Sequence, residues 1–561
     1  MVKQFPPIKI EILKKGGEDR NPAIQLFGRR FFTDQTVQEL LIEFLLVASS
    51  VKQIGGSRIS IDQVFPGFDL LRNWPEKMPL EYAAKARINL KLFSFLGASK
   101  LETRHKSHQQ HYRRLLDLLK SPEKLVRSES IDTTEVLRTL ENLFLGFQGV
   151  GGQRTWCAQG FVPIVREMIC AETIWNDTQA KRDKIDDWSD IVKRFIHFFS
   201  LSRHRFLARG GELLYLQICN TFRQEEETLN NWAQKNNLSF SNRESSPVKL
   251  HDALRNAINS VLGACPDTID KLAAFIDTGI ESETAKLTEY KENSEEPRFT
   301  PCGWCPTESW PEGYLFSVEI LRISEAAIDP IERLELMEIA CAVQVLRSLC
   351  AQSARYVDWI QERKKYSGPL SYVWAISDPN GRNNALKQIS KRCVNNIQRM
   401  IYDAVRHSGI KSVLEAQKTN DNSHGLEWKD PYSEVDARYG HKLFLTLSKR
   451  IGLIVPKRGA GARFTLNDKL IRFLVLSVVR PGERMRYNTF KNLVFAHYGI
   501  ALDKEKIGQA CEWCGYKKLS TLGEESDEWF VEMLEASGVL LRLSDAHSLV
   551  INPFDNGENK L

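Results

Sequence analysis

The chain has 561 residues, 42% hydrophobic and 26% charged, which is the balance of an ordinary globular protein and too long for a single hydrophobic core. Its eleven cysteines are odd in number and mostly scattered singly, which argues against a disulfide framework. No apolar run reaches the roughly 20 residues that span a bilayer, so we expect a cytoplasmic protein without membrane association.

Helical periodicity dominates the first 420 residues. A helix is predicted over residues 35–50, capped by Thr33 and Asp34, with apolar side chains recurring along one stripe. Three more helices are predicted, one starting near Asp132, one following Pro330 as far as residue 366, and one over residues 386–404. The sequence therefore predicts a mainly α fold.

Three polar stretches interrupt this pattern, at residues 236–249, 290–313 and 417–433. They are rich in Asn, Ser, Pro and Glu and have little apolar surface to bury, so they are predicted to be linkers or long loops. The resulting segments are an N-terminal helical domain at 1–150, a second helical domain at 151–290, a helical middle domain at 291–425 and a C-terminal region at 426–561.

The C-terminal region has a different character. A helix predicted over residues 436–450 leads into "GLIVPKRGAGARFTL", in which Leu453–Val455 and Arg463–Leu466 are expected to pair as a β-hairpin. Four helix-length segments and a second pair of β-rich runs, ending near residue 554, follow. Helices followed by a two-stranded hairpin form the order of a winged helix–turn–helix, and this order occurs twice. The predicted fold is thus a multidomain helical body with C-terminal tandem winged-helix modules.

The positive charge of the protein is concentrated in this region. From residue 438 to 486, twelve Lys and Arg stand against two acids, while the rest of the chain is slightly acidic. Phosphate contacts supply most non-specific affinity for DNA, and they are made by Lys and Arg. We therefore predict that double-stranded DNA is bound by the cations at the end of the helix and around the hairpin tip, which are Lys449, Arg450, Lys457, Arg458 and Arg463.

Other motifs are weaker. The glycine-rich stretch 146–156 lacks the lysine of a phosphate loop and is interpreted as a joint between helical bodies. Arg203, Arg205 and Arg209 precede a helix that opens near Gly211, where they either hold an anion or flank a helix start that Glu212 already satisfies.

The sequence contains cysteines and histidines that could serve as metal ligands. Two CxxC pairs, Cys302–Cys305 and Cys511–Cys514, lie 209 residues apart, and the second is predicted inside a helix, so a shared zinc site is not favoured. Cys302–Cys305 falls in a loop and is the better candidate for redox or metal chemistry. The histidines of residues 105–111 spread over a basic helix face. We predict neither a metal nor another cofactor.

The stretches at residues 452–500 and, more faintly, 152–164 resemble uncharacterised accessory proteins encoded in bacterial multi-gene anti-phage defence clusters. The resemblance covers about a tenth of the chain. It implies a complex subunit that works beside nucleases, ATPases or methyltransferases, and it transfers no catalytic residue.

Together these observations favour a non-enzymatic, DNA-binding or scaffolding component of a bacterial complex with protein partners. Two alternatives stay open. In the first, the winged-helix region is a protein-docking adaptor without DNA contact. In the second, the chain is an enzyme, such as a nuclease, whose dispersed site leaves no motif in the sequence.

Overall fold

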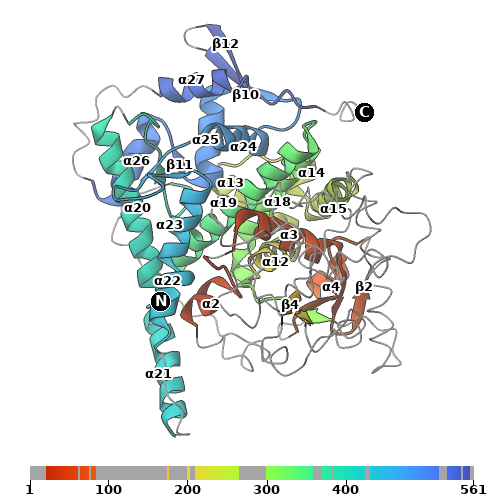
Figure 1. Cartoon of the computed structure of the whole chain (residues 1–561). Helices are drawn as coiled ribbons and strands as arrows, with labels where there is room; N and C mark the ends of the chain where they lie inside the picture. The colour runs from red at the N-terminus through yellow and green to blue at the C-terminus, as the bar shows by residue number, and fades with distance from the viewer. Residues whose placement is uncertain are drawn as a thin grey trace, which may run out of the picture.

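Helices form most of the described part of the chain, as expected (Figure 1). The computed structural model describes residues 21–33, 35–60, 63–74, 78–83, 173–175, 199–201, 209–264, 299–357, 368–381, 383–423, 430–516, 527–544 and 547–555. The helices up to residue 356 are α2 (Pro22–Phe27), α3 (Val37–Ser49), α4 (Phe68–Arg72), α12 (Gly210–Phe222), α13 (Glu226–Lys235), α14 (Asn242–Ser245), α15 (Pro247–Gly263), η4 (Thr307–Ser309), α18 (Trp310–Glu325) and α19 (Pro330–Tyr356). The later helices are α20 (Asn384–Ala404), α21 (Ser408–Ser423), α22 (Tyr432–Arg438), α23 (His441–Arg450), α24 (Asp468–Val478), α25 (Tyr487–Tyr498), α26 (Lys504–Cys514) and α27 (Glu528–Ala536).

The strands are short and form five small sheets in the described part of the chain. The four-stranded sheet has the order β2 (Ser57–Ile59), β1 (Val51–Ile54), β3 (Leu80–Ala83) and β6 (Thr300–Pro301), and the three-stranded sheet has the order β10 (Arg484–Arg486), β13 (His547–Ile551) and β12 (Leu540–Ser544). The two-stranded sheets pair β4 (Thr173–Trp175) with β5 (Phe199–Leu201), β7 (Trp374–Ala375) with β11 (Ile500–Ala501), and β8 (Ile454–Val455) with β9 (Arg463–Phe464). Among the described helices, none combines the length and apolarity that a membrane span requires.

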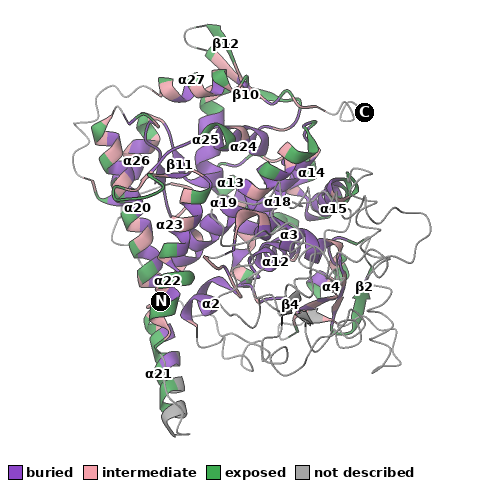
Figure 2. Ribbon diagram, in the orientation of Figure 1, coloured by how far each residue is buried: buried purple, intermediate pink, exposed green. Residues whose placement is uncertain are grey.

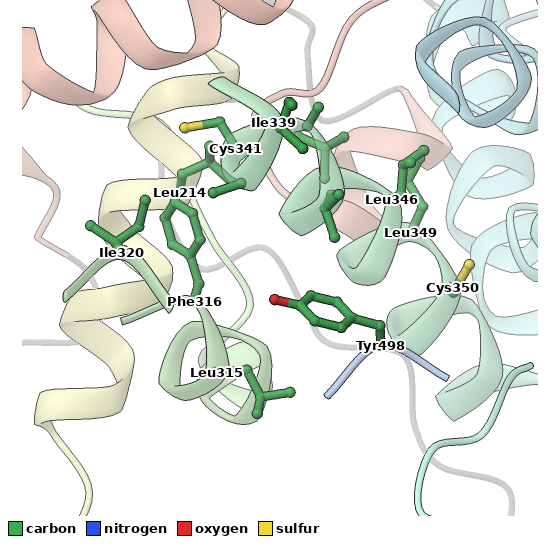
Figure 3. Close-up of a cluster of buried hydrophobic side chains, with 14 of the residues drawn as sticks. Leu214, Leu315, Phe316, Ile320, Ile339, Cys341, Leu346, Leu349, Cys350 and Tyr498 are labelled. Atoms are coloured by element: carbon green, nitrogen blue, oxygen red, sulfur yellow. The ribbon is translucent and has the colours of Figure 1, made fainter. Parts of the chain in front are cut away.

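The core is centred on α12, α18 and α19. Figure 3 shows Leu214 from α12, Phe316 and Ile320 from α18, and Leu346 from α19 among its side chains, with Tyr498 at the end of α25 reaching the same cluster. Glycine lets α12 pack closely against α3, because a Cβ on Gly211 would lie 2.5 Å from the Leu40 carbonyl oxygen. The helices are therefore positioned by backbone approach as well as by side-chain packing.

Three helix predictions are confirmed, with corrections at two boundaries: the cap of α3, and the end of α19, which lies at Tyr356 with Val357 extended although the prediction continued to residue 366. The expected helices at 35–50 and 386–404 are α3 and α20, and the one after Pro330 is α19. The predicted cap of α3 is wrong, because Thr36 forms a capping box with Glu39. The Thr33 hydroxyl instead donates to the Arg438 carbonyl oxygen at 2.5 Å. Asp34, the predicted helix near Asp132 and the end of the predicted helix beyond residue 357 lie outside the described residues.

All three predicted loops contain helical residues, and in 290–313 these are η4 and the start of α18 at Trp310. Within 236–249, Ser241 and Glu244 form a second capping box that starts α14, and α15 begins at Pro247. The stretch 417–433 includes the end of α21, a helix that projects from the body and is exposed over much of its surface (Figures 1 and 2). Described residues from all four predicted domains contribute to one hydrophobic cluster, so the segments pack together across the predicted boundaries.

The C-terminal elements follow the expected order. The single helix predicted over 436–450 is divided at Gly440 into α22 and α23, which is a correction. The predicted hairpin is confirmed, with Ile454 opposite Phe464 and Val455 opposite Arg463. After α24 and α25, the chain makes a detour in which β11 pairs with β7 and α26 packs on α20. It then forms α27 and the β12–β13 hairpin, whose strands join β10 in one sheet.

Candidate nucleic-acid interface

The β8–β9 hairpin carries the residues that the sequence singles out. Residues 456–461, the turn between its strands, are exposed. Gly459 and Gly461 have φ angles of 92° and 86°, a left-handed conformation that glycine adopts without steric cost. These glycines let the turn bend while Lys457 and Arg458 remain in solvent.

The base of the hairpin is fixed by aromatic packing. Phe464 is fully buried and stacks on Trp374 with ring centroids 6.0 Å apart. Its backbone N–H donates to the Ser390 hydroxyl on α20 at 2.7 Å, and its carbonyl oxygen accepts from the Ser377 hydroxyl at 2.8 Å. The base of the hairpin at β9 is therefore packed against β7 and hydrogen-bonded to α20, and the exposed tip extends from this base.

Arg463 is part of this base. One guanidinium nitrogen donates to the Ser377 hydroxyl at 2.8 Å and to the Asp378 carbonyl oxygen at 3.3 Å. The other donates to the Pro379 carbonyl oxygen at 3.1 Å. Burial lowers the pKa of Arg463 from its ordinary value, but the group stays a cation at neutral pH. A phosphate contact by Arg463 would have to compete with three hydrogen bonds within the protein.

The two cations that end α23 differ as well. Lys449 is half-buried, and within the described residues its ammonium has neither a hydrogen bond nor an ion pair. Arg450 is exposed, but its guanidinium donates to the Gln35 carbonyl oxygen at 2.7 Å, which holds α23 against the loop before α3. Three of the five predicted site residues therefore have side chains that a ligand can reach, and these are Lys449, Lys457 and Arg458.

Two lysines that sequence reasoning did not select lie beside the hairpin, Lys391 near its tip and Lys387 near Gly381 and Arg463 at its base. A Cβ on Gly461 would lie 3.7 Å from the Lys391 ammonium, and a Cβ on Gly381 would lie 3.0 Å from that of Lys387. Both lysines are on α20, one helical turn apart, and so face the same side. We use the name basic edge for Lys387, Lys391, Lys449, Lys457 and Arg458. The four-residue spacing of Lys387 and Lys391 places them on one helix face and could have marked them as a pair. No local sequence feature indicated that α20 lies beside the hairpin.

Several other cations of the C-terminal region form ion pairs with glutamates of the helical body. Arg472 forms a two-point ion pair with Glu332, and Lys469 pairs with Glu335 at 2.6 Å, which ties α24 to the start of α19. Arg480 reaches Glu244 at 2.8 Å, and the same carboxylate accepts from Arg322 at 2.6 Å. Burial alone would raise the pKa of Glu244, but the two arginines outweigh it and hold the pKa well below its usual range. These cations stabilise the packing of the C-terminal region on the helical body.

Residues 527–544, near the C-terminal end of the described chain, have the opposite charge. Residues 438–464 contain seven Lys and Arg and no acid, whereas residues 527–544 contain four Asp and Glu and one Arg. That arginine, Arg542, donates to Glu528 at 3.0 Å and also pairs with Glu535 on α27. Of these two segments, residues 438–464 are therefore the one that attracts a polyanion.

The alternative sites are occupied or buried. At the start of α12 the Glu43 carboxylate accepts from the backbone N–H groups of Arg209 and Gly211 at 3.0 and 2.7 Å, and Glu212 accepts from Gly303 at 2.6 Å. Protein carboxylates thus fill the predicted anion position, which agrees with a self-satisfied helix start, although Glu43 rather than Glu212 caps it. Arg203, Arg205, the 146–156 stretch and the histidines of 105–111 lie outside the described residues.

Both CxxC pairs are buried. Cys511 and Cys514 lie within α26, as predicted, and Cys302 and Cys305 follow β6 as free thiols. Burial raises the pKa of Cys302 well above its usual value and that of Cys305 to about 12, so neither thiol forms a reactive thiolate at neutral pH. The described residues contain no group of three or more His, Cys, Asp or Glu arranged to hold a metal ion.

No protein-family model, curated protein or solved structure matches the chain.

Proposed function

We propose that the chain is a non-enzymatic, DNA-binding component of a bacterial complex, and that it contacts the backbone of double-stranded DNA through the basic edge. The observation that carries the proposal is the exposed pair Lys457 and Arg458 on a rigidly based hairpin, beside Lys387 and Lys391 and with no acid between residues 438 and 464. Such a surface attracts phosphates without reading base sequence. The anti-phage defence context belongs to the proposal through the resemblance of residues 452–500.

We also propose that the C-terminal region consists of two winged-helix modules. In the first, α20, α22 and α23 form the helical part and β8–β9 the wing, with α21 as an insertion. In the second, α24, β10, α25, α27 and β12–β13 follow the winged-helix order, with β11 and α26 inserted before α27. The sheet order β10–β13–β12 supports the second assignment, because in that fold the strand after the first helix joins the hairpin as its third strand.

The positions of α23 and the wing favour phosphate contact over deep insertion into a groove. Arg450 at the end of α23 is attached to Gln35, and Thr33 is attached to Arg438 at the end of α22. The segment before α3 therefore contacts the chain at both ends of α23. DNA that approaches along the wing and the side of α20 that carries Lys387 and Lys391 leaves these contacts intact.

The experiment is a binding measurement with the full chain and two duplexes of about 25 base pairs and unrelated sequence. The proposal predicts similar affinities for both duplexes, because phosphate contacts carry no sequence information. The K457E/R458E variant should lose most of this affinity. The matched control, K235E/K249E, makes the same charge change at exposed positions on α13 and α15 and should bind like the parent. Equal losses in the two variants would mean that net charge, not the basic edge, determines binding.

A further inference from the structure

Among the described residues, the three-stranded sheet β10–β13–β12 has one covered face and one open face. Residues directly opposite each other in an antiparallel ladder point to the same side, so Leu540, Val550 and Met485 share one face. Val550 is fully buried, and Arg542, on the same side by alternation with its partner Ser548, is held by carboxylates of α27. Helix α27 therefore covers the inner face of the sheet.

The outer face is apolar in its middle and along its free edge. Leu541 lies opposite Leu549, and alternation places Ile551 on the same side of β13. Leu541 is 46% exposed, and Leu543, which lies at a register shift on the free edge of β12 and has no partner in the ladder, is 60% exposed. They are two of six exposed large hydrophobic side chains in the described residues, and no other two of these six lie so close along the chain. Exposed apolar side chains that cluster on one face mark interaction sites more often than scattered ones do.

The other border of this face is positively charged. Arg486 lies opposite Leu549 and Arg484 opposite Ile551, so both arginines point to the outer face from β10. Both are exposed, and within the described residues neither has an ion pair or a hydrogen bond. The outer face thus runs from leucines on β12 to arginines on β10, over a width of about 10 Å for three strands.

This combination determines what can cover the face. An α-helix is about 10 Å wide, so one helix lying along the sheet can cover Leu541 and Leu549 and still reach Arg484 and Arg486 at its border. It must bring apolar side chains for the leucines and carboxylates for the arginines, because arginines desolvated without a counter-charge destabilise a complex. Duplex DNA would neutralise the arginines but leave the leucines in water.

A second copy of the chain fits less well. The residues on the outer face include no carboxylate. Two such faces packed together would place arginines against arginines or against leucines. We infer that the outer face of the β10–β13–β12 sheet, defined by Leu541, Leu549, Ile551, Arg484 and Arg486 with Leu543 at its free edge, is a docking site for an amphipathic acidic helix of a partner protein. The inference goes beyond DNA binding by the basic edge and does not depend on it.

The test uses the full chain and two labelled helical peptides of about 18 residues, with leucines at every third or fourth position and either Glu or Lys at their border. Fluorescence anisotropy should show saturable binding of the Glu peptide and much weaker binding of the Lys peptide. L541S/L543S should weaken binding of the Glu peptide by about tenfold or more, since buried apolar anchors dominate such interfaces. R484E/R486E should reverse the preference, so that the Lys peptide binds better than the Glu peptide.

The controls separate this result from loss of folding and from non-specific adhesion. V248S/I331S removes two other exposed apolar side chains and should leave peptide binding unchanged. Thermal unfolding of each variant should match that of the parent, because the substituted side chains are exposed. The inference is overturned if the Glu peptide does not bind, or if L541S/L543S binds it like the parent. It is also overturned if sedimentation shows that L541S/L543S abolishes self-association, or if R484E/R486E abolishes DNA binding.

Discussion

Arg463 provides a prediction that separates structural cations from ligand-binding ones. The Arg463→Ala substitution removes three hydrogen bonds to residues 377–379, and these bonds attach β9 to the segment that follows β7. Hydrogen bonds from a charged donor contribute about 1.5–3 kcal/mol each when buried, and we reduce their sum to about 2 kcal/mol because the guanidinium is half-exposed. A change of this size corresponds to about 30-fold in an opening equilibrium.

Native-state hydrogen exchange measures this opening directly. The backbone N–H of Phe464 donates to Ser390, and that of Thr465 donates to the Leu453 carbonyl oxygen, so both report on the closed hairpin. Both should exchange about 30-fold faster in Arg463→Ala, while K457A/R458A leaves them unchanged because those side chains are exposed. If exchange is unaltered in Arg463→Ala, the three hydrogen bonds do not hold the hairpin, and Arg463 is available to DNA.

Three further predictions concern stability and thiol chemistry. Glu244→Gln should lower the free energy of unfolding by about 3–5 kcal/mol at neutral pH, because it leaves Arg322 and Arg480 without their buried counter-charge. Since the folded-state pKa of Glu244 is depressed, this contribution is fully present above about pH 4.5 and is lost progressively as the pH falls from there through the folded-state pKa, so denaturation curves of parent and variant should converge in acid. Gly211→Ala should cost about 3 kcal/mol in a denaturant titration because α3 and α12 must separate, whereas Gly263→Ala, whose Cβ would meet nothing within 4 Å, should not destabilise. Cys302 and Cys305 should react with a thiol reagent only after unfolding; rapid reaction, or one zinc per chain that is lost in Cys302→Ser, would contradict their assignment as inert buried thiols.

Local sequence patterns predicted the elements well. The three- and four-residue steps from Leu386 to Ala404 correspond to the buried face of α20, and the turn glycines of 459–461 correctly placed the β8–β9 hairpin. Local features also misled at boundaries. Thr33 and Thr36 both precede the same apolar stripe, and only the capping box with Glu39 distinguishes Thr36. The apolar periodicity of residues 436–450 continues across Gly440 in the sequence, which is why one helix was predicted. The helix itself is interrupted at this glycine.

The use of charge could not be predicted from sequence. The local excess of ten cations appeared as one basic surface, but Lys469, Arg472 and Arg480 are neutralised by glutamates more than 130 residues away. No spacing rule connects such partners, because tertiary packing brings them together. For the same reason Lys387 and Lys391 were not selected, since their position beside the hairpin depends on how α20 packs on β9.

The salt dependence of DNA binding tests the central claim most directly. Each phosphate neutralised in duplex DNA contributes about 0.9 to the slope of log affinity against log salt concentration, so K457A/R458A should flatten that slope by up to about 1.8. The control K235A/K249A, with two exposed lysines removed from α13 and α15, should keep the slope of the parent. An unchanged slope in K457A/R458A would contradict phosphate contact at the hairpin tip and would favour a docking role for the first module as well.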